Sequence, residues 1–357
     1  MAYSAAMSAD GPAMPAGRFW VLRLMPDAPG RTALAVLLAF GASAASVALM
    51  AVSAWLLSRA AEHPPVLYLQ VAAIGVRVFG ISRGLFRYLE RLVGHDVALR
   101  LQSALRIGTY QRLARTTLLG SRRGDLLARV TADVDAVLEL IVRFVVPVVS
   151  ASLVIVATSA VFAAFSPATA LWLLGSALVA GVLVPGLAQW LSRRYDEAAA
   201  PARGELAAGV HELARTAPDL VAYGVADAAL GRVLAVDERL KRQDDRSAWI
   251  RGVAAGCQVL AAAVAVLAAL LIGGSQVADG TLPPVMLAVL VLTPLALHEV
   301  LSTLTQAAQS ATRSLASLRR VREVLDAPPV GVGDRDLPPP VAPGALVLTG
   351  LAIGWPG

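Results

Sequence analysis

The chain has 357 residues, of which 57% are hydrophobic and only 16% are charged, and its mean hydropathy is +0.66. Soluble domains carry about 25% charged residues, so these values exclude an ordinary soluble protein and predict a membrane protein. The formal net charge of +6 does not indicate a nucleic-acid partner, because the basic residues, all arginine except Lys241, gather at the ends of apolar runs.

The N-terminal part precedes the first long apolar run. Residues 1–17 lack the basic start and apolar stretch of a signal peptide and are expected to be disordered. Residues 18–25 have the pattern of a short amphipathic helix at the membrane surface.

Six apolar runs follow, each long enough for a spanning helix, which needs about 20 largely apolar residues. They predict an all-α membrane protein with spans at Thr32–Leu57, Pro65–Phe86, Leu140–Phe165, Ala168–Leu191, Ile250–Gly273 and Leu282–Leu304.

The positive charges lie on one side of these spans. Arginines are frequent before the first span and in the connections from second to third and from fourth to fifth, whereas the opposite loops hold only Arg59. Because loops rich in arginine stay in the cytoplasm, we expect a multi-pass plasma-membrane protein with both termini cytoplasmic.

Two of the cytoplasmic connections are long. In the segments Arg87–Ala136 and Ser192–Trp249, apolar residues recur at helical spacing, and helix breakers cluster at Gly120 and Gly124 in the first and at Pro218 and Gly224 in the second. We therefore predict two helical hairpins that extend the spanning helices into the cytoplasm. Such extensions suit a rod that transmits force from a cytoplasmic partner.

The second span carries a cationic stripe. At roughly 100° per residue its polar side chains share an arc of about 140°, and a charge in hydrocarbon usually faces protein or a watery cavity. One interpretation is a cavity that attracts anions; the alternative is structural, with Arg87 paired to Glu90 or Glu299. The stripe consists of Arg77, Arg83, Arg87, Tyr88, Arg91 and His95.

Acidic residues suggest two further hypotheses. Glu299 lies in the sixth span, where it is either a counter-ion to the second-span arginines or a proton acceptor during transport. The aspartates near residues 125–135 lack the order of a calcium-binding loop, so no metal site is expected.

Three stretches carry a family resemblance. The runs Ser82–Asp96 (SRGLFRYLERLVGHD), Leu105-Arg106 and Gly124–Asp135 (GDLLARVTADVD) resemble the CydC subunit of CydDC-type ABC exporters. The resemblance covers about residues 17–330. It implies a six-helix type 1 ABC exporter transmembrane domain at 18–327, a heterodimer with a CydD-like subunit, and a thiol reductant role in cytochrome bd assembly, with cysteine, glutathione or haem as cargo.

The resemblance also assigns site residues. His95 and Arg91 fall where the family places a haem-contacting pair, and Arg87, Arg83, Tyr88 and Glu299 would line the cargo path. An alternative for His95 is an interhelical histidine beside Asp96. The segments Leu119–Leu126 and Ala217–Gly224 would be coupling helices that dock on nucleotide-binding domains, through Arg122, Gly124, Asp125, Asp219 and Tyr223.

The C-terminal part departs from the resemblance. Residues 328–344 read as a linker, and 345–357 resemble the first strand of a nucleotide-binding domain, with Trp355 where an aromatic stacks on adenine or, alternatively, as a lone linker aromatic. No G-x-x-x-x-G-K-[ST] phosphate loop occurs. ATP would therefore bind to nucleotide-binding domains not encoded here, the chain being either a truncated product or a partner of a separate ATPase.

Three functions remain open: a CydC-type subunit exporting thiols or haem-related cargo, an ABC exporter half for lipids or drugs, and a non-transporting membrane protein that binds haem or regulates. The cationic stripe argues against the second, whose cargo path is expected to be less cationic.

Overall fold

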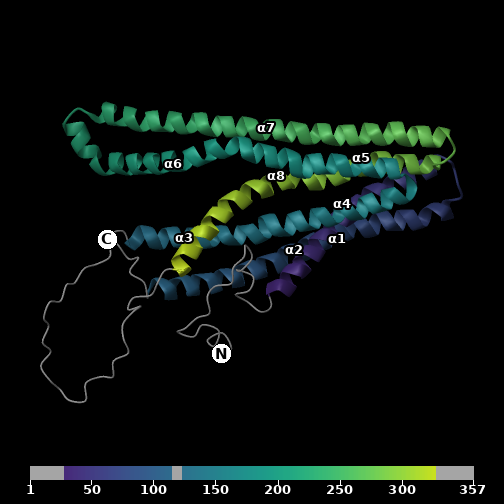
Figure 1. Cartoon of the computed structure of the whole chain (residues 1–357), viewed down its shortest axis with the longest axis horizontal. Coiled ribbons are helices and arrows are strands. Elements are labelled where there is room, and N and C mark those ends of the chain that lie inside the picture. Colours follow the sequence, from purple (N-terminus) through teal and green to yellow (C-terminus); the bar gives the residue numbers. More distant parts are fainter. Residues whose placement is uncertain (1–27, 115–122, 327–357) are drawn as a thin grey trace, which may run out of the picture. The chain divides into compact units, whose positions relative to one another are not determined.

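The computed structural model describes residues 28–114 and 123–326, and within these ranges the chain is helical. Figure 1 shows the helices in chain order. The elements are α1 (Ala28–Ala60), α2 (Val66–Leu113), α3 (Arg123–Leu140), η2 (Ile141–Val145), α4 (Val146–Phe165), α5 (Pro167–Leu178), η3 (Val179–Leu183), α6 (Val184–Ala222), α7 (Ala226–Ala278) and α8 (Pro284–Asp326).

The prediction of six spanning helices is confirmed. Six helical stretches are long and apolar enough to cross a membrane, and each coincides with one predicted run to within two residues at its start or contains it. Several are much longer than the bilayer requires: α7 has 53 residues, or about 80 Å at 1.5 Å per residue, whereas the hydrocarbon core is about 30 Å thick. The N-terminal segment 1–25, the linker 328–344 and the predicted strand 345–357 lie outside the described residues.

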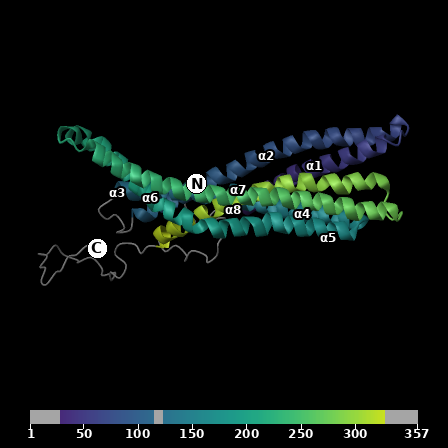
Figure 2. The same ribbon diagram turned by 90° about the horizontal axis from the view of Figure 1, so that it is seen from above.

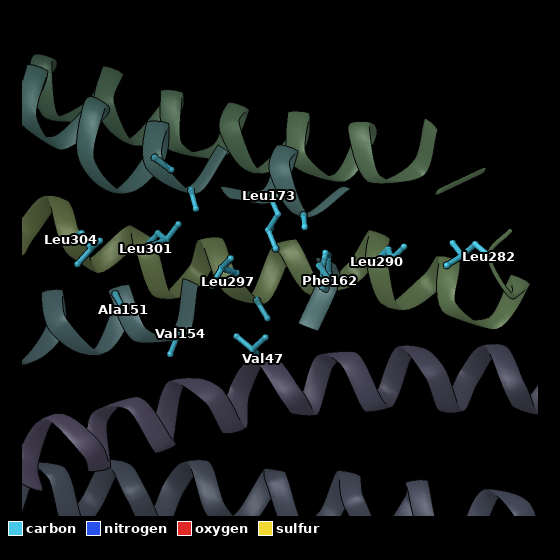
Figure 3. Packing of buried hydrophobic residues seen from close by; sticks show 14 residues of the cluster. Val47, Ala151, Val154, Phe162, Leu173, Leu282, Leu290, Leu297, Leu301 and Leu304 are labelled. Atoms are coloured by element: carbon cyan, nitrogen blue, oxygen red, sulfur yellow. The ribbon is translucent and has the colours of Figure 1, made fainter. Parts of the chain in front are cut away.

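The chain forms two compact units, which are described separately. The larger comprises residues 36–90 and 146–309. Its core is apolar and draws on α1, α4, α5 and α8, and Figure 3 shows the side chains meeting between these helices. Its largest fully buried members are Leu173, Leu290, Leu297, Leu301 and Val154.

Within this unit, α6 and α7 form the second predicted hairpin, which is confirmed. The two helices run side by side in both views (Figures 1 and 2). Ion pairs join them, with 2.9 Å between Arg203 Nη2 and Asp244 Oδ1 and 3.1 Å between Arg239 Nη2 and Glu205 Oε1. These pairs are exposed, so each contributes at most about 1 kcal/mol and serves mainly to set the alignment of the two helices.

The turn of this hairpin lies at Gly224, the second of its two predicted helix breakers, and not at Pro218. Helix α6 continues through Pro218 and ends at Ala222. The chain then reverses at Gly224, whose φ of +67° is a left-handed conformation that glycine adopts without strain. Pro218 does not break the helix, because a proline costs one backbone hydrogen bond and a bend rather than an obligatory stop.

The smaller unit comprises the described parts of residues 1–35, 91–145 and 310–357. Leu101 and Leu105 of α2 pack with Val134 and Val137 of α3, and Val321 of α8 completes the core. The regularly spaced apolar residues that predicted the first hairpin thus include the residues that form this core. The turn itself, with Gly120, lies outside the described residues.

A buried carboxylate ties α3 to α8 in the same unit. Asp133 is only 6% exposed. Its Oδ2 accepts a hydrogen bond from Arg320 Nε at 2.8 Å, and its Oδ1 accepts a second from Arg320 Nη2, so the contact is bidentate. The hydrogen bond to Asp133 raises the pKa of Arg320, which keeps the guanidinium charged.

Two short π-helical segments interrupt the third and fourth spans, and both end just before a Val-Pro pair: η2 before Val146-Pro147 and η3 before Val184-Pro185. In η3 the Val184 N–H bonds to Val179 O, five residues back. Proline has no N–H, so neither Val184 nor Pro185 bonds to the Ala180 carbonyl. Gln258 of α7 does so instead, with 3.0 Å between its Nε2 and Ala180 O.

This arrangement gives a stability prediction. Gln258→Leu should lower the free energy of unfolding by about 1–3 kcal/mol, because it leaves a buried carbonyl without a donor. Thermal unfolding in detergent would measure it. Gln276→Leu is the matched control on the same helix: the Gln276 amide oxygen is buried without a partner among the described residues, so this change should be neutral or stabilising, and equal losses in both variants would contradict the assignment.

Candidate functional site: the cationic face of α2

The stripe crosses from one unit to the other within α2, so its two parts are described in turn. In the larger unit, Arg77, Arg83 and Arg87 are exposed, and Tyr88 is 65% exposed. The opposite side of the helix packs against α1, where the Phe86 ring lies so close to Gly41 that a Cβ there would come within 3.2 Å of it. Glycine at 41 therefore permits the helices to approach while the arginines stay on the uncovered side.

The described residues of the larger unit do not neutralise these arginines. Arg77, Arg83 and Arg87 form no ion pair with any described residue. Glu299 of α8 is exposed as well, and no described side chain pairs with it. Among the described residues, no ion pair joins Arg87 to Glu299.

In the smaller unit, Arg91 and His95 are exposed, and as i and i+4 residues they project from the same side of α2. Neither hydrogen bonds to a described residue. The neighbouring Asp96 is engaged elsewhere: Arg31 of α1 donates to its Oδ2, and Arg100 Nε lies 2.9 Å from its Oδ1. Asp96 thus pairs with two arginines rather than with His95.

The uncovered side of α2 combines these cations with exposed apolar side chains, including Val71, Ile81 and Leu85 at 78%, 72% and 54%. Lipid tails can solvate the apolar side chains, but an unpaired guanidinium in hydrocarbon is costly. The cationic face must therefore meet protein or a water-filled cavity when the chain is in a membrane.

His298 and Glu299 are neighbours in sequence but lie on different sides of α8. His298 is buried, with Nδ1 2.9 Å from Pro294 O. Glu299 faces outward. His298 thus belongs to the core of the larger unit, and within the described ranges no group of three His, Cys, Asp or Glu residues has metal-site geometry.

The turn of the α6–α7 hairpin carries two exposed side chains, Val221 and Tyr223, which together are called the knob. Tyr223 is 82% exposed and Val221 69% exposed, and the Asp219 carbonyl accepts the Tyr223 N–H at 2.9 Å. Just behind it, a groove of about 370 Å³ between the two helices is lined by Glu205, Glu212 and Arg232 among others. Periodicity alone did not indicate this groove, which depends on how the two helices align.

The remaining predicted positions are not described by the structure. Arg122 and Trp355 lie outside the described residues, and Gly124 and Asp125 belong to α3, where the Asp125 side chain is not described.

Comparison with known proteins agrees with this architecture. Residues 32–297 match the ABC transporter transmembrane region family. The chain is 28% identical to the Escherichia coli glutathione/L-cysteine transport system ATP-binding/permease protein CydC over 303 residues, which is 83% of this chain and 53% of that protein. It is 29% identical to the Bacillus subtilis protein of the same system, CydD, over 288 residues, 78% of this chain and 49% of that protein.

The chain spans about half the length of these curated relatives. The match nonetheless covers four of the six spans in full and most of the first and the last, together with both hairpins. The resemblance seen in the α2 and α3 motifs is thus matched along most of the sequence, and the chain belongs to the ABC transporter transmembrane region family.

Proposed function

We propose that this chain is the transmembrane part of a CydC-type subunit in a heterodimeric ABC exporter, in which a CydD-like subunit is the partner and cysteine, glutathione or a haem-related anion is the cargo. ATP would act on nucleotide-binding domains, and export would support cytochrome bd assembly. The termini would be cytoplasmic in the plasma membrane.

The observation that carries the proposal is the unpaired cationic face of α2. Glutathione and haem both bear carboxylates, and arginine binds a carboxylate through two parallel hydrogen bonds. Arg83 and Arg87, one turn apart and without an ion pair to any described residue, would line a path for such anions. A CydD-like subunit covering α2 would also supply the protein or cavity that these charges require.

The residues of the smaller unit fit haem. A neutral imidazole is an axial ligand of haem iron, and His95 is exposed without a hydrogen bond to a described residue. Arg91, one turn earlier, would pair with a propionate. Haem bound here would be cargo or a sensed ligand, and any chemistry at the iron would belong to the haem and not to the protein.

The knob at the α6–α7 turn would be one docking point for a nucleotide-binding domain. Tyr223 and Val221 form an exposed apolar patch, and such a patch is more stable when a partner protein covers it than when it faces water. The ion pairs along the hairpin would help it move as one body, so that a displacement at the knob reaches the spans. The second docking point would be the turn near Arg122.

Transport tests the proposal directly. The chain, joined or co-expressed with nucleotide-binding domains, is reconstituted with a CydD-like subunit into vesicles, and ATP-dependent accumulation of labelled cysteine, glutathione and haem is measured. We expect flux of at least one of these anionic or thiol solutes. Flux of a neutral lipid or hydrophobic drug in its place would favour the alternative exporter, and haem binding without any flux would favour the non-transporting protein.

Haem binding is tested separately. Adding haem to the purified chain should give an absorption spectrum of ligated iron, and His95→Ala should abolish that spectrum because the axial nitrogen is lost. His211→Ala, an exposed histidine on α6, is the matched control and should leave it unchanged. An identical spectrum in wild type and His95→Ala would remove His95 as the ligand.

A further inference from the structure

The larger unit contains an apolar pocket that the proposed transport path does not use. Its volume is about 200 Å³, and its wall, contributed by α1, α4 and α8, is apolar and includes Val52, Trp55, Phe162, Phe165, Met286 and Val289. Two residues of the wall, Phe162 and Leu290, are also core residues and are labelled in Figure 3. Val161 and Phe165 are 57% and 46% exposed, so the pocket opens on the surface of the unit.

The pocket lies at one end of the spans. Trp55 precedes the end of α1 at Ala60 by five residues, Phe165 is the last residue of α4, and Met286 follows the start of α8 at Pro284 by two. At 1.5 Å per residue, the pocket is within about 10 Å of the helix ends. This is the level where hydrocarbon meets the headgroups and where tryptophan is enriched.

One arginine lies near the same end of α1 as the pocket. Arg59 follows Trp55 by four residues and Val52 by seven, so the three side chains share one face of α1. The three connections at this end, residues 61–65, 166 and 279–283, contain no lysine or arginine. Arg59 therefore lies on the side that membrane proteins usually keep poor in positive charge, where an anionic group can approach it.

The existing contact of Arg59 leaves room for that anion. Arg59 Nη1 bonds to Glu62, and both side chains are more than 40% exposed. An exposed ion pair of this kind contributes at most about 1 kcal/mol, and guanidinium has five N–H donors. A phosphate can therefore bind beside Glu62 or displace it.

We infer that this pocket is a phospholipid site, in which one acyl chain fills the apolar pocket and the headgroup phosphate binds Arg59. An acyl chain gains nothing hydrophobic by leaving the bilayer for the pocket, because both surroundings are apolar. Selectivity therefore comes from the phosphate–Arg59 contact, while the pocket wall gains the van der Waals contacts that an unfilled void would lack. The occupant is a resident lipid, and the inference holds whichever cargo the exporter carries.

Fluorescence quenching tests the inference. The full chain is placed in phosphatidylcholine bilayers with a small fraction of lipid carrying brominated acyl chains, and the Trp55 signal is taken as the difference between wild type and Trp55→Phe. Net anionic phosphatidylglycerol should be enriched at Trp55 by up to about five-fold over brominated phosphatidylcholine, because the choline ammonium offsets the phosphate charge of phosphatidylcholine and one arginine near the headgroups favours a net anionic lipid by about 1 kcal/mol.

Two variants and two controls sharpen this test. Arg59→Gln should equalise quenching by the two lipids, and Ala51→Phe should reduce quenching by both because its ring fills the pocket. Trp172, 52% exposed on α5, a helix that contains no Lys or Arg, reports bulk lipid through Trp172→Phe and should show no preference; Arg193→Gln on α6 should leave the Trp55 preference unchanged. Inorganic phosphate should not compete, which separates a lipid from a free anion.

Other results would overturn the inference. Equal quenching by both lipids in wild type, unaffected by Arg59→Gln, means that no phosphate site exists. Absence of Trp55 quenching, or its appearance only when the protein is diluted in the bilayer, means that a second chain covers the pocket.

Discussion

Replacing Arg83 and Arg87 together with glutamine should reduce ATP-dependent flux of the anionic cargo at least about ten-fold in the reconstituted exporter. Each arginine lost removes a charge-assisted hydrogen bond of about 1.5–3 kcal/mol, and 1.4 kcal/mol corresponds to a factor of ten. The loss should be smaller with lysine at both positions, because the charge remains but the bidentate geometry does not.

The matched control for this experiment is Arg193→Gln. Arg193 is an exposed arginine of α6 whose Nε lies 2.6 Å from Glu197 Oε1 on the same helix. Its replacement should leave flux unchanged. If the double glutamine variant transports as well as wild type, while folding and assembly are intact, the cationic face of α2 does not bind cargo.

Arg320→Leu should lower the free energy of unfolding by about 3 kcal/mol, because it leaves the carboxylate of Asp133 buried without its partner. The double change Asp133→Leu with Arg320→Leu should recover most of this loss, since two apolar residues can replace a buried ion pair at little cost. Thermal unfolding in detergent, followed by circular dichroism, measures all three proteins.

Arg322 provides the control on the same helix. Its Nε lies 3.2 Å from Asp326 Oδ2 in an exposed pair, which contributes at most about 1 kcal/mol. Arg322→Leu should therefore be much milder than Arg320→Leu. Equal effects of the two changes would mean that burial of Asp133 does not set the strength of the α3–α8 contact.

The spans and the second hairpin could be predicted because they depend on composition and spacing within one segment. A run of about 20 apolar residues satisfies its backbone only as a helix in a membrane, and apolar spacing of 3.6 residues continues that helix into the cytoplasm. The cationic face of α2 is also local, since six residues on one helix define it.

Contacts between distant residues could not be predicted in this way. Asp133 and Arg320 are 187 residues apart, and neither the sequence near Asp133 nor that near Arg320 indicates the other. Pro185 does indicate that one backbone carbonyl of the fourth span lacks its helical donor. The residue that donates to this carbonyl, Gln258, lies on α7. The apolar pocket could not be predicted either, because residues from three different helices form its wall.

The joint between α4 and α5 has a mechanical consequence. A single residue, Ser166, separates Phe165 from Pro167, and its side chain caps α5 by accepting the Thr169 N–H at 3.3 Å. Two spans joined by one capped residue can tilt about that point, but neither can slide along its axis without carrying the other. Any piston-like displacement of the third span is therefore imposed on the fourth, and a tag or spacer inserted at Ser166 would uncouple them.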